Sequence, residues 1–292
     1  MKDDFYDYRQ QKGYSLKTIQ SQDSYIGRFK SWLVKEHIPT SQISYHAILS
    51  HLSFLRQGNR TPQGMRNHLQ AIRVYLDYLV STGILNYNPA GNIHLRSVSL
   101  KPLSQALNEE LLLEIYRWFA SLEQKHEKRQ AQHLRDTVVL GLLLFQGLDS
   151  GDIQRLCPKD INPREGTIYI PSSRTAAARK LKLESLQILS IQEYLTLPSR
   201  NINELSINDH LFTKSKIQDM VSAIVRKVKQ RYPEVMDPRH IRSSVIQNWL
   251  RTNHIRQVQY MAGHRSITST ERYQKDNLHD LSIQLQKYHP MK

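Results

Sequence analysis

The most informative stretch of this chain is residues 263–273, Gly-His-Arg-Ser-Ile-Thr-Ser-Thr-Glu-Arg-Tyr. It sets His264 and Tyr273 nine residues apart, with Ser266 and Thr270 between them, and Arg242 comes earlier in the chain. A Gly-His pair alone is a weak signal. The meaning of the stretch therefore depends on the spacing of the whole run and on the chain around it.

Upstream of this stretch, the sequence from residue 99 onward predicts a mixed α+β domain, mainly helical. Asn108 caps a helix that runs to Phe119, and residues 136–145 form a helix that is apolar nearly all round and is therefore expected at the centre. Residues 167–170 and 180–183 alternate like the strands of a small β-hairpin, and a basic loop, residues 172–179, joins them. After residue 185 the pattern is helical again.

The first 98 residues predict a separate, purely helical domain. Ser15 caps one amphipathic helix, a short helix fits residues 47–55, and Thr61-Pro62 opens a third that stops near Gly83. Residues 88–102 are rich in turn-forming residues and have no periodicity, which is typical of a linker. We therefore expect two domains, 1–98 and 99–292.

Composition restricts the partners of such a protein. The 292 residues include 41 Lys+Arg against 26 Asp+Glu, a net charge of +15 that is shared by both halves. This favours an extended polyanion as partner over a solvated basic surface. The single cysteine, Cys157, excludes an intrachain disulfide and a cysteine-based zinc site, and no histidine pair has metal-ligand spacing. With no apolar run of about 20 residues, we expect a cytoplasmic protein without a membrane partner.

Taken together, the run 263–273 and Arg242 resemble the C-terminal signature of the tyrosine recombinase (phage integrase) family. The resemblance extends over nearly the whole chain. The first 98 residues look like the family's helical core-site DNA-binding (SAM-like) domain, closed by Asn88-Pro89, and Gly147-Leu148 with Asp152 looks like its Gly-Leu-Arg-x-x-Glu box. The hairpin falls where the family carries a basic catalytic residue. The similarity is to the minimal two-domain form, without an arm-binding domain before residue 1.

The resemblance implies a chemistry for these residues. Tyr273 would attack a DNA phosphate to give a 3′-phosphotyrosyl link, Arg242 would be the second of two clamping arginines, and His264 would hydrogen-bond the phosphate or assist proton transfer. Such a reaction needs neither ATP nor a metal, so no cofactor is expected. The partner would be double-stranded DNA, held by a homo-tetramer, or an assembly with a paralogue, that forms on it. Residues 278–288 have helical apolar spacing. In the family such a tail can dock on a neighbouring protomer, and the alternative is that it packs on its own domain.

Several positions depart from the family pattern. Asp149 stands where the first clamping arginine is expected, which reverses the charge beside the phosphate. Arg239 replaces a histidine, although the adjacent His240 could take its place, and Ser243 replaces another. In the hairpin, Arg174, Arg179 and Lys180 compete for the role of the family lysine, with Arg174 nearest the strand end. Rescue of the missing arginine by Arg155 is not expected, because helical spacing puts it on another face.

Three functions stay open at this point. The first is a site-specific recombinase or integrase, of the kind mobile elements use, that cuts with Tyr273. The second, motivated by Asp149 and Arg239, is a DNA-binding protein of the same fold that regulates or shapes DNA without cutting. The third is an unrelated helical protein with a basic surface.

Overall fold

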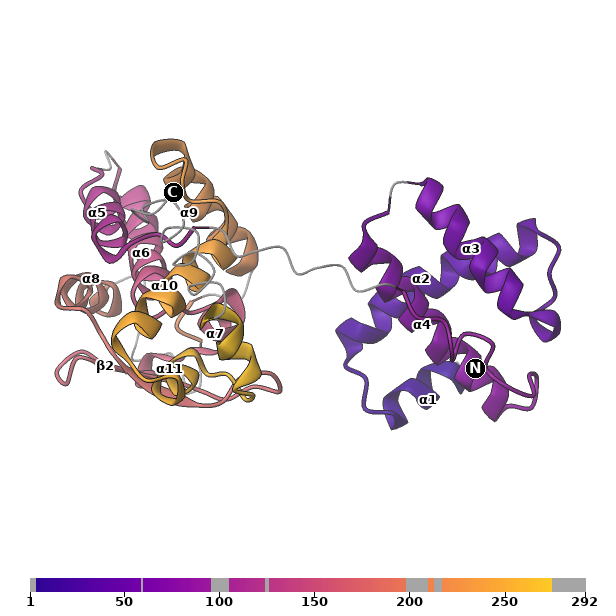
Figure 1. The fold of residues 1–292 in the computed structure, drawn as a ribbon. Helices are drawn as coiled ribbons and strands as arrows, with labels where there is room; N and C mark the ends of the chain where they lie inside the picture. Colours follow the sequence, from indigo (N-terminus) through magenta and orange to yellow (C-terminus); the bar gives the residue numbers. More distant parts are fainter. Residues whose placement is uncertain are drawn as a thin grey trace, which may run out of the picture. The chain divides into compact units, whose positions relative to one another are not determined.

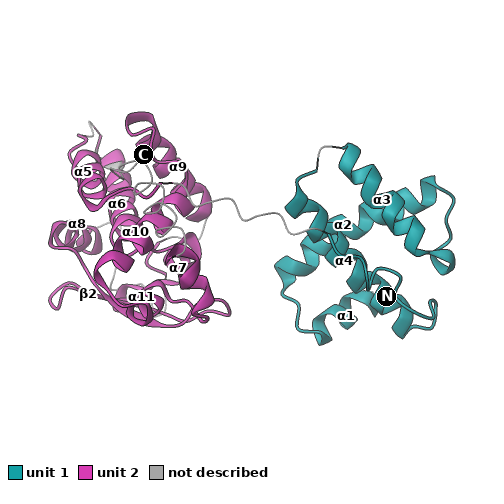
Figure 2. Cartoon of the chain, viewed as in Figure 1, with its two compact units in different colours: residues 1–101 teal, residues 102–292 magenta. Residues whose placement is uncertain are grey.

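The computed structural model describes residues 4–58, 60–95, 105–123, 126–197, 210–212 and 217–274. The chain divides into two compact units, Met1–Lys101 (unit 1) and Pro102–Lys292 (unit 2), coloured separately in Figure 2. Each unit has its own hydrophobic core. The two cores share no residue.

Unit 1 is a bundle of four helices: α1 (Asp4–Gln11), α2 (Leu16–Lys35), α3 (Tyr45–Gln57) and α4 (Pro62–Ser81), with a short 3-10 turn at Thr40–Gln42 (Figure 1). The predicted caps are confirmed. The Ser15 hydroxyl accepts the Thr18 amide at 3.2 Å, and the Thr61 hydroxyl accepts the Gly64 amide at 3.1 Å. Sequence reasoning missed α1, whose Phe5 packs on the rings of Tyr75 and Tyr78 of α4.

The end of unit 1 is tied back onto α4. The Asn88 side-chain amide donates to the Arg73 carbonyl at 3.1 Å and to Asp77 at 2.6 Å. The Arg73 guanidinium in turn donates to the backbone carbonyls of Ala90 and Ile93. These bonds anchor residues 88–93 on the bundle, so the chain leaves unit 1 from a fixed position.

Two histidines are buried in the core of unit 1. His51 of α3 and His68 of α4 are 0% and 1% exposed, and none of their four ring nitrogens has a hydrogen-bond partner among the described residues. Burial lowers the pKa of both rings to about 4; the neighbouring His68 adds to the effect on His51, and Arg28 and Arg60 add to the effect on His68. Both rings are therefore neutral at pH 7.

This pair makes unit 1 sensitive to acid. Between pH 6.5 and pH 4 the unfolded chain binds a proton at each histidine that the folded unit does not, so the free energy of unfolding should fall by up to about 1.4 kcal/mol per pH unit for each ring. Amide hydrogen exchange over residues 4–95 measures this fall. The double variant His51→Leu/His68→Leu should lose most of the pH dependence, while His46→Leu, on the exposed face of α3, should keep it. Equal pH dependence in all three proteins would contradict the assignment.

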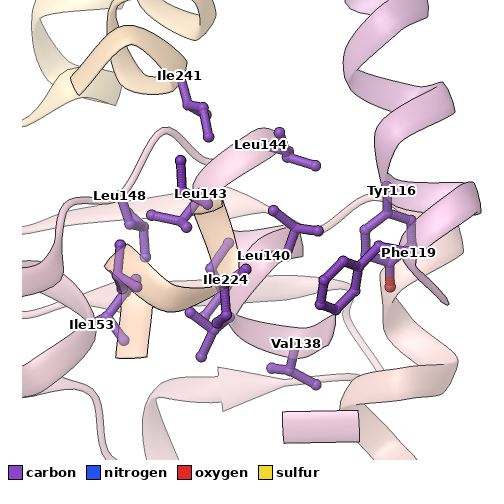
Figure 3. Close-up of a cluster of buried hydrophobic side chains, with 14 of the residues drawn as sticks. Tyr116, Phe119, Val138, Leu140, Leu143, Leu144, Leu148, Ile153, Ile224 and Ile241 are labelled. Carbon is purple, nitrogen blue, oxygen red and sulfur yellow. The ribbon is translucent and has the colours of Figure 1, made fainter. Parts of the chain in front are cut away.

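Unit 2 is built around one buried helix. α6 (Glu127–Leu144) packs against α5 (Glu109–Ala120), α8 (Ser185–Thr196), α9 (Ile217–Arg231) and α10 (Pro238–Thr252). Its C-terminal half is buried on every side, as predicted for residues 136–145. Figure 3 shows Leu140, Leu143 and Leu144 among side chains of α5, α9 and α10. Asn108 caps α5 through the Leu111 amide at 2.8 Å, also as predicted.

A three-stranded antiparallel sheet lies at the edge of unit 2. Its strands are β1 (Ile161–Asn162), β2 (Thr167–Ile170) and β3 (Arg179–Lys182), in the order β1-β2-β3. Ile168 pairs with both Ile161 and Leu181, and all three side chains are buried. Because side chains alternate along a strand, Arg179 faces inward with Leu181. The side chain of Arg179 is therefore buried in unit 2.

Two short helices complete the described part of unit 2. α7 (Ser150–Arg155) follows Gly147-Leu148, and α11 (Ile255–Ala262) packs against α10 and β3. Residues 268–274 are again helical, while the proposed tail, residues 278–288, lies outside the described residues. The mainly helical fold with a small sheet is the predicted fold class. Across the described ranges, no helix combines the length and the apolar character needed to cross a membrane.

Candidate active site

A buried carboxylate organises the chemistry-bearing residues of unit 2. Asp152 of α7 is 1% exposed, and its two oxygens contact three arginines from three elements. Oδ2 lies 2.7 Å from Nη2 of Arg179 on β3 and 3.4 Å from Nη1 of Arg242 on α10, and Oδ1 lies 2.6 Å from Nη2 of Arg155 on α7. Burial acts to raise the pKa of Asp152, but Arg179, with Arg242 and Arg155, outweighs it and holds that pKa below its usual range. Asp152 is therefore an anion that joins three cations.

Asp149 has a structural role beside this group. It is the N-cap of α7, where its Oδ1 accepts the Asp152 amide at 2.8 Å, and Asp152 returns a weaker contact to the Asp149 amide at 3.5 Å. This reciprocal arrangement is a capping box, which stabilises a helix start. The carboxylate of Asp149 is exposed. The residue that replaces the expected arginine thus begins the helix that carries Asp152.

The side chain of Arg179 is fully buried against the turn that precedes His264. A Cβ atom on Gly263 would overlap Nη1 of Arg179, and Gly263 has a positive φ of 71° that few residues other than glycine adopt. The hairpin is fastened to the same turn: the Ala177 amide donates to the Gly263 carbonyl at 2.9 Å, and Arg265 donates to the Ser173 carbonyl at 2.7 Å. The hairpin that carries β3 is therefore bonded directly to the turn that carries His264.

Arg242 is held by backbone carbonyls on two sides. Its Nη1 donates to the Gly147 carbonyl, and its Nη2 donates to the Ala262 carbonyl at 2.8 Å. Its side chain is 16% exposed, and within the described residues its Nε–H and one Nη2–H have no partner. A guanidinium fixed in this way keeps donors for an anion without needing to reorganise.

His264 and Tyr273 lie face to face. Their rings stack with centroids 5.9 Å apart and an interplanar angle of 8°. Nδ1 of His264 lies 2.8 Å from the hydroxyl of Thr270, which is 0% exposed. Burial, together with the charges of Arg242 and Arg179, lowers the pKa of His264 to about 4. The structure thus brings Arg242, His264 and Tyr273 into one region, which we call the phosphate site.

The remaining predicted residues lie elsewhere or on the rim. His240 is buried, its Nε2 lies 2.8 Å from the Gln105 carbonyl and its Nδ1 accepts the Met236 amide at 3.3 Å, so both ring nitrogens are occupied away from the phosphate site. Arg239 is exposed at the start of α10. Of the three hairpin candidates, Arg179 is buried, Lys180 pairs with Glu165 at 3.1 Å, and Arg174 is exposed in the loop between β2 and β3.

Arg155 contacts Asp152, although its helical spacing from Asp149 predicted that it would lie on another face. Its side chain extends back along α7, so that Nη1 lies 3.6 Å from the point where a Cβ on Gly151 would lie, and Nη2 pairs with Asp152. Arg155 and Arg242 therefore contact opposite oxygens of one carboxylate. In the described part of the chain, no three His, Cys, Asp or Glu side chains are grouped so as to hold a metal ion.

The family can now be assigned. Residues 118–279 match the profile of the phage integrase family, a range that contains every residue of the phosphate site. The chain belongs to this family. The match covers more than half of the sequence, and the resemblance inferred from residues 263–273 is confirmed.

Curated relatives resemble this integrase over most of its length, and solved structures share its fold. A tyrosine recombinase XerC of Pelotomaculum thermopropionicum is 26% identical and the alignment covers 97% of this chain and 95% of the relative. A tyrosine recombinase of Agathobacter rectalis is 26% identical over 73% of this chain and 71% of its own. Among solved structures, the Tn1549 transposon integrase in complex with a circular intermediate DNA has a TM-score of 0.66 at 13% identity, with 92% of both chains covered. XerH recombinase bound to difH substrate has a TM-score of 0.64 at 20% identity, over 83% of this chain and 70% of its own.

The glycine between Arg179 and His264 offers a test of this assembly. Gly263→Ala should destabilise unit 2 by at least about 1–2 kcal/mol, because alanine is strained at positive φ and its Cβ would displace the buried Arg179. Hydrogen exchange over residues 105–274 measures the loss. The matched control is Gly27→Ala in α2, where a Cβ meets no atom within 4 Å and should stabilise unit 1 by about 0.5–1 kcal/mol. A Gly263→Ala protein as stable as the parent would show that the turn is not constrained.

Proposed function

We propose that this integrase is a site-specific DNA recombinase that cleaves and rejoins DNA through Tyr273. The observation that carries the proposal is the stacking of Tyr273 on His264, beside an Arg242 whose remaining donors have no partner among the described residues. A DNA phosphate that accepts hydrogen bonds from Arg242 and His264 would lie next to the tyrosine hydroxyl. The recombinases among its relatives favour this function over a DNA-binding protein that does not cut.

In the proposed reaction the Tyr273 oxygen forms a bond to phosphorus as the bond to the 5′-oxygen of DNA breaks. The phenol gives its proton to water and the leaving 5′-oxygen takes one from water, so phosphorus keeps the same number of ester bonds in the 3′-phosphotyrosyl link and reversal rejoins the strand. Arg242 would stabilise the charge on the non-bridging oxygens. Arg174, exposed in the hairpin loop, is the candidate for the contact on the leaving-group side.

Unit 1 offers a second surface for DNA. Two adjoining hollows over α2, α3 and α4 share Ser24, Arg28 and Arg60, and Lys35 lines the first of them. These three basic side chains are exposed, and phosphate contacts of this kind position a protein on a duplex. We propose that this surface binds the DNA backbone beside the cleavage site.

The assembly and location belong to the same proposal. We propose that the integrase works as a tetramer assembled on DNA, with its own copies or with a paralogue, and that it acts in the cytoplasm. The Tn1549 transposon integrase and XerH, which share this fold, are both bound to DNA in their solved structures. Arg239, exposed at the start of α10, would add a phosphate contact outside the phosphate site, while His240 would hold residue 105 in place.

Covalent trapping tests the reaction. Duplexes that the integrase selects from its own genomic DNA, nicked next to the bound site so that rejoining fails, should yield an adduct that resists SDS. Tyr273→Phe should abolish the adduct and leave DNA binding unchanged, because only the hydroxyl is removed. Binding without an adduct in the parent would favour the non-cutting alternative, and an adduct in Tyr273→Phe would assign the nucleophile to another residue.

Asp149 should act against cleavage through its charge rather than its shape. Asp149→Asn keeps an N-cap acceptor for the Asp152 amide, so stability should change by no more than about 0.5 kcal/mol, whereas Asp149→Arg would lose the cap. Removing the negative charge should raise the rate of adduct formation by roughly tenfold. The matched control is Asp160→Asn, whose carboxylate also caps a turn by accepting the Cys157 amide at 2.8 Å. The same increase in both variants, or none in Asp149→Asn, would show that Asp149 is only a cap.

A further inference from the structure

Thr270 has a contact that the proposed reaction does not yet use. Its hydroxyl lies 2.8 Å from Nδ1 of His264, and the residue is 0% exposed. Its backbone amide is already occupied by the Ile267 carbonyl at 2.8 Å. Within the described residues, the hydroxyl has no hydrogen-bond partner other than the imidazole nitrogen. The two side chains must therefore satisfy each other.

This pairing decides which ring nitrogen carries the proton. If Nδ1 carried it, Nδ1 would donate to the threonine oxygen, and the buried hydroxyl hydrogen would have no acceptor. If Nε2 carries it, Nδ1 accepts the hydroxyl hydrogen and both groups are paired. An unpaired buried donor is costly enough to favour the second arrangement by about tenfold or more. A doubly protonated ring would also leave the hydroxyl unpaired, in agreement with a pKa of His264 lowered to about 4 by burial, Arg242 and Arg179.

We propose that Thr270 is a positioning residue that holds His264 as the Nε2–H tautomer, so that His264 donates a hydrogen bond to the phosphate and does not accept the proton of Tyr273. The inference rests on the proposed strand cleavage for its function, but the tautomer itself is a property of the free protein. It separates the two roles that the sequence left open for His264.

The same contact aligns the nucleophile. Thr270 and Tyr273 lie one turn apart in the helical residues 268–274, so they share a face of that helix. While the hydroxyl of Thr270 bonds one edge of the imidazole, the ring of Tyr273 stacks on its face. Thr270 therefore determines which nitrogen of His264 carries the proton and also helps to hold Tyr273 against the imidazole ring.

The first measurement is direct and needs no DNA. In the full chain labelled with ¹⁵N-histidine, long-range ¹H–¹⁵N correlations at pH 7 should show His264 with an unprotonated Nδ1 and a protonated Nε2. The resonances are assigned by their loss in His264→Gln. Thr270→Val, which replaces the hydroxyl by a methyl group of similar size, should give a mixture of tautomers, and Thr270→Ser should restore the parental spectrum. A protonated Nδ1 in the parent would overturn the inference whether or not the protein cleaves DNA.

The second measurement connects the tautomer to the reaction. On the nicked duplex, Thr270→Val should form the covalent adduct about tenfold more slowly than the parent at equal DNA affinity, and Thr270→Ser within about threefold of it. The control is Thr268→Val, an exposed threonine whose hydroxyl pairs with Ser266 at 2.7 Å; it should react like the parent. Equal rates for Thr270→Val and the parent would overturn the positioning role.

A third variant separates donor from base. Glutamine places an N–H group near the position of Nε2 but cannot accept a proton, so His264→Gln should retain at least tenfold more cleavage than His264→Ala. If both variants lose cleavage equally, His264 acts as a base and the inference fails. A parent that shows the predicted tautomer but forms no adduct would contradict the proposed function alone, so the two failures are distinguishable.

Discussion

The carboxylate of Asp152 is the interaction on which the rest of unit 2 depends. Three guanidinium groups from α7, β3 and α10 converge there, and without the anion between them they would repel one another. Arg179, which is fully buried, would also bear its desolvation cost without an opposite charge. The pair with Arg179 is fully buried, so removal of either partner would leave a charge in the core, an effect of about 3–5 kcal/mol. The proposed phosphate site brings several cations close together, and Asp152 reduces the repulsion between them.

Asp149 shows how stability and charge compete at one position. Its side chain begins α7 and so places Asp152, yet it puts an exposed negative charge beside the site where DNA phosphate is proposed to bind. Arg155 partly offsets that charge, since its guanidinium extends back along the helix to the same turn. The prediction that Arg155 lies on another face considered only the direction of each residue around the helix axis. Long side chains in a helix also point toward its N-terminus, which brings the Arg155 guanidinium back to the first turn. Although Asp149 replaces the expected arginine, three other arginines therefore lie around Asp152.

Most of the fold could be predicted from local signals, and the failures have physical causes. Ser15, Thr61 and Asn108 are caps with a hydroxyl or amide acceptor, and the even apolar distribution of residues 136–145 indicated a central helix. α1 was missed because its burial depends on distant partners: Phe5 on Tyr75, and the buried Arg9 on Asp23 at 2.6 Å. Tyr273, His264 and Arg242 were singled out by the resemblance of residues 263–273 and Arg242 to the family signature. The position of Arg179 required one more step, since extending the alternation of residues 180–183 by one residue places it on the inward face with Leu181.

The protonation of the phosphate site follows from the same arrangement. Arginine stays charged at any physiological pH, the pKa of Asp152 is held low by its three partners, and the pKa of His264 lies near 4 because the ring is buried beside Arg242 and Arg179. The positive charge is thus carried entirely by guanidinium groups, and the histidine contributes a directed N–H rather than a charge. Since neither Asp152 nor His264 changes its protonation near pH 7, neutral pH leaves the charge of these groups constant. The donors presented to DNA are then fixed by geometry: by the turn at Gly263, the hairpin bonded to it, and the hydroxyl of Thr270.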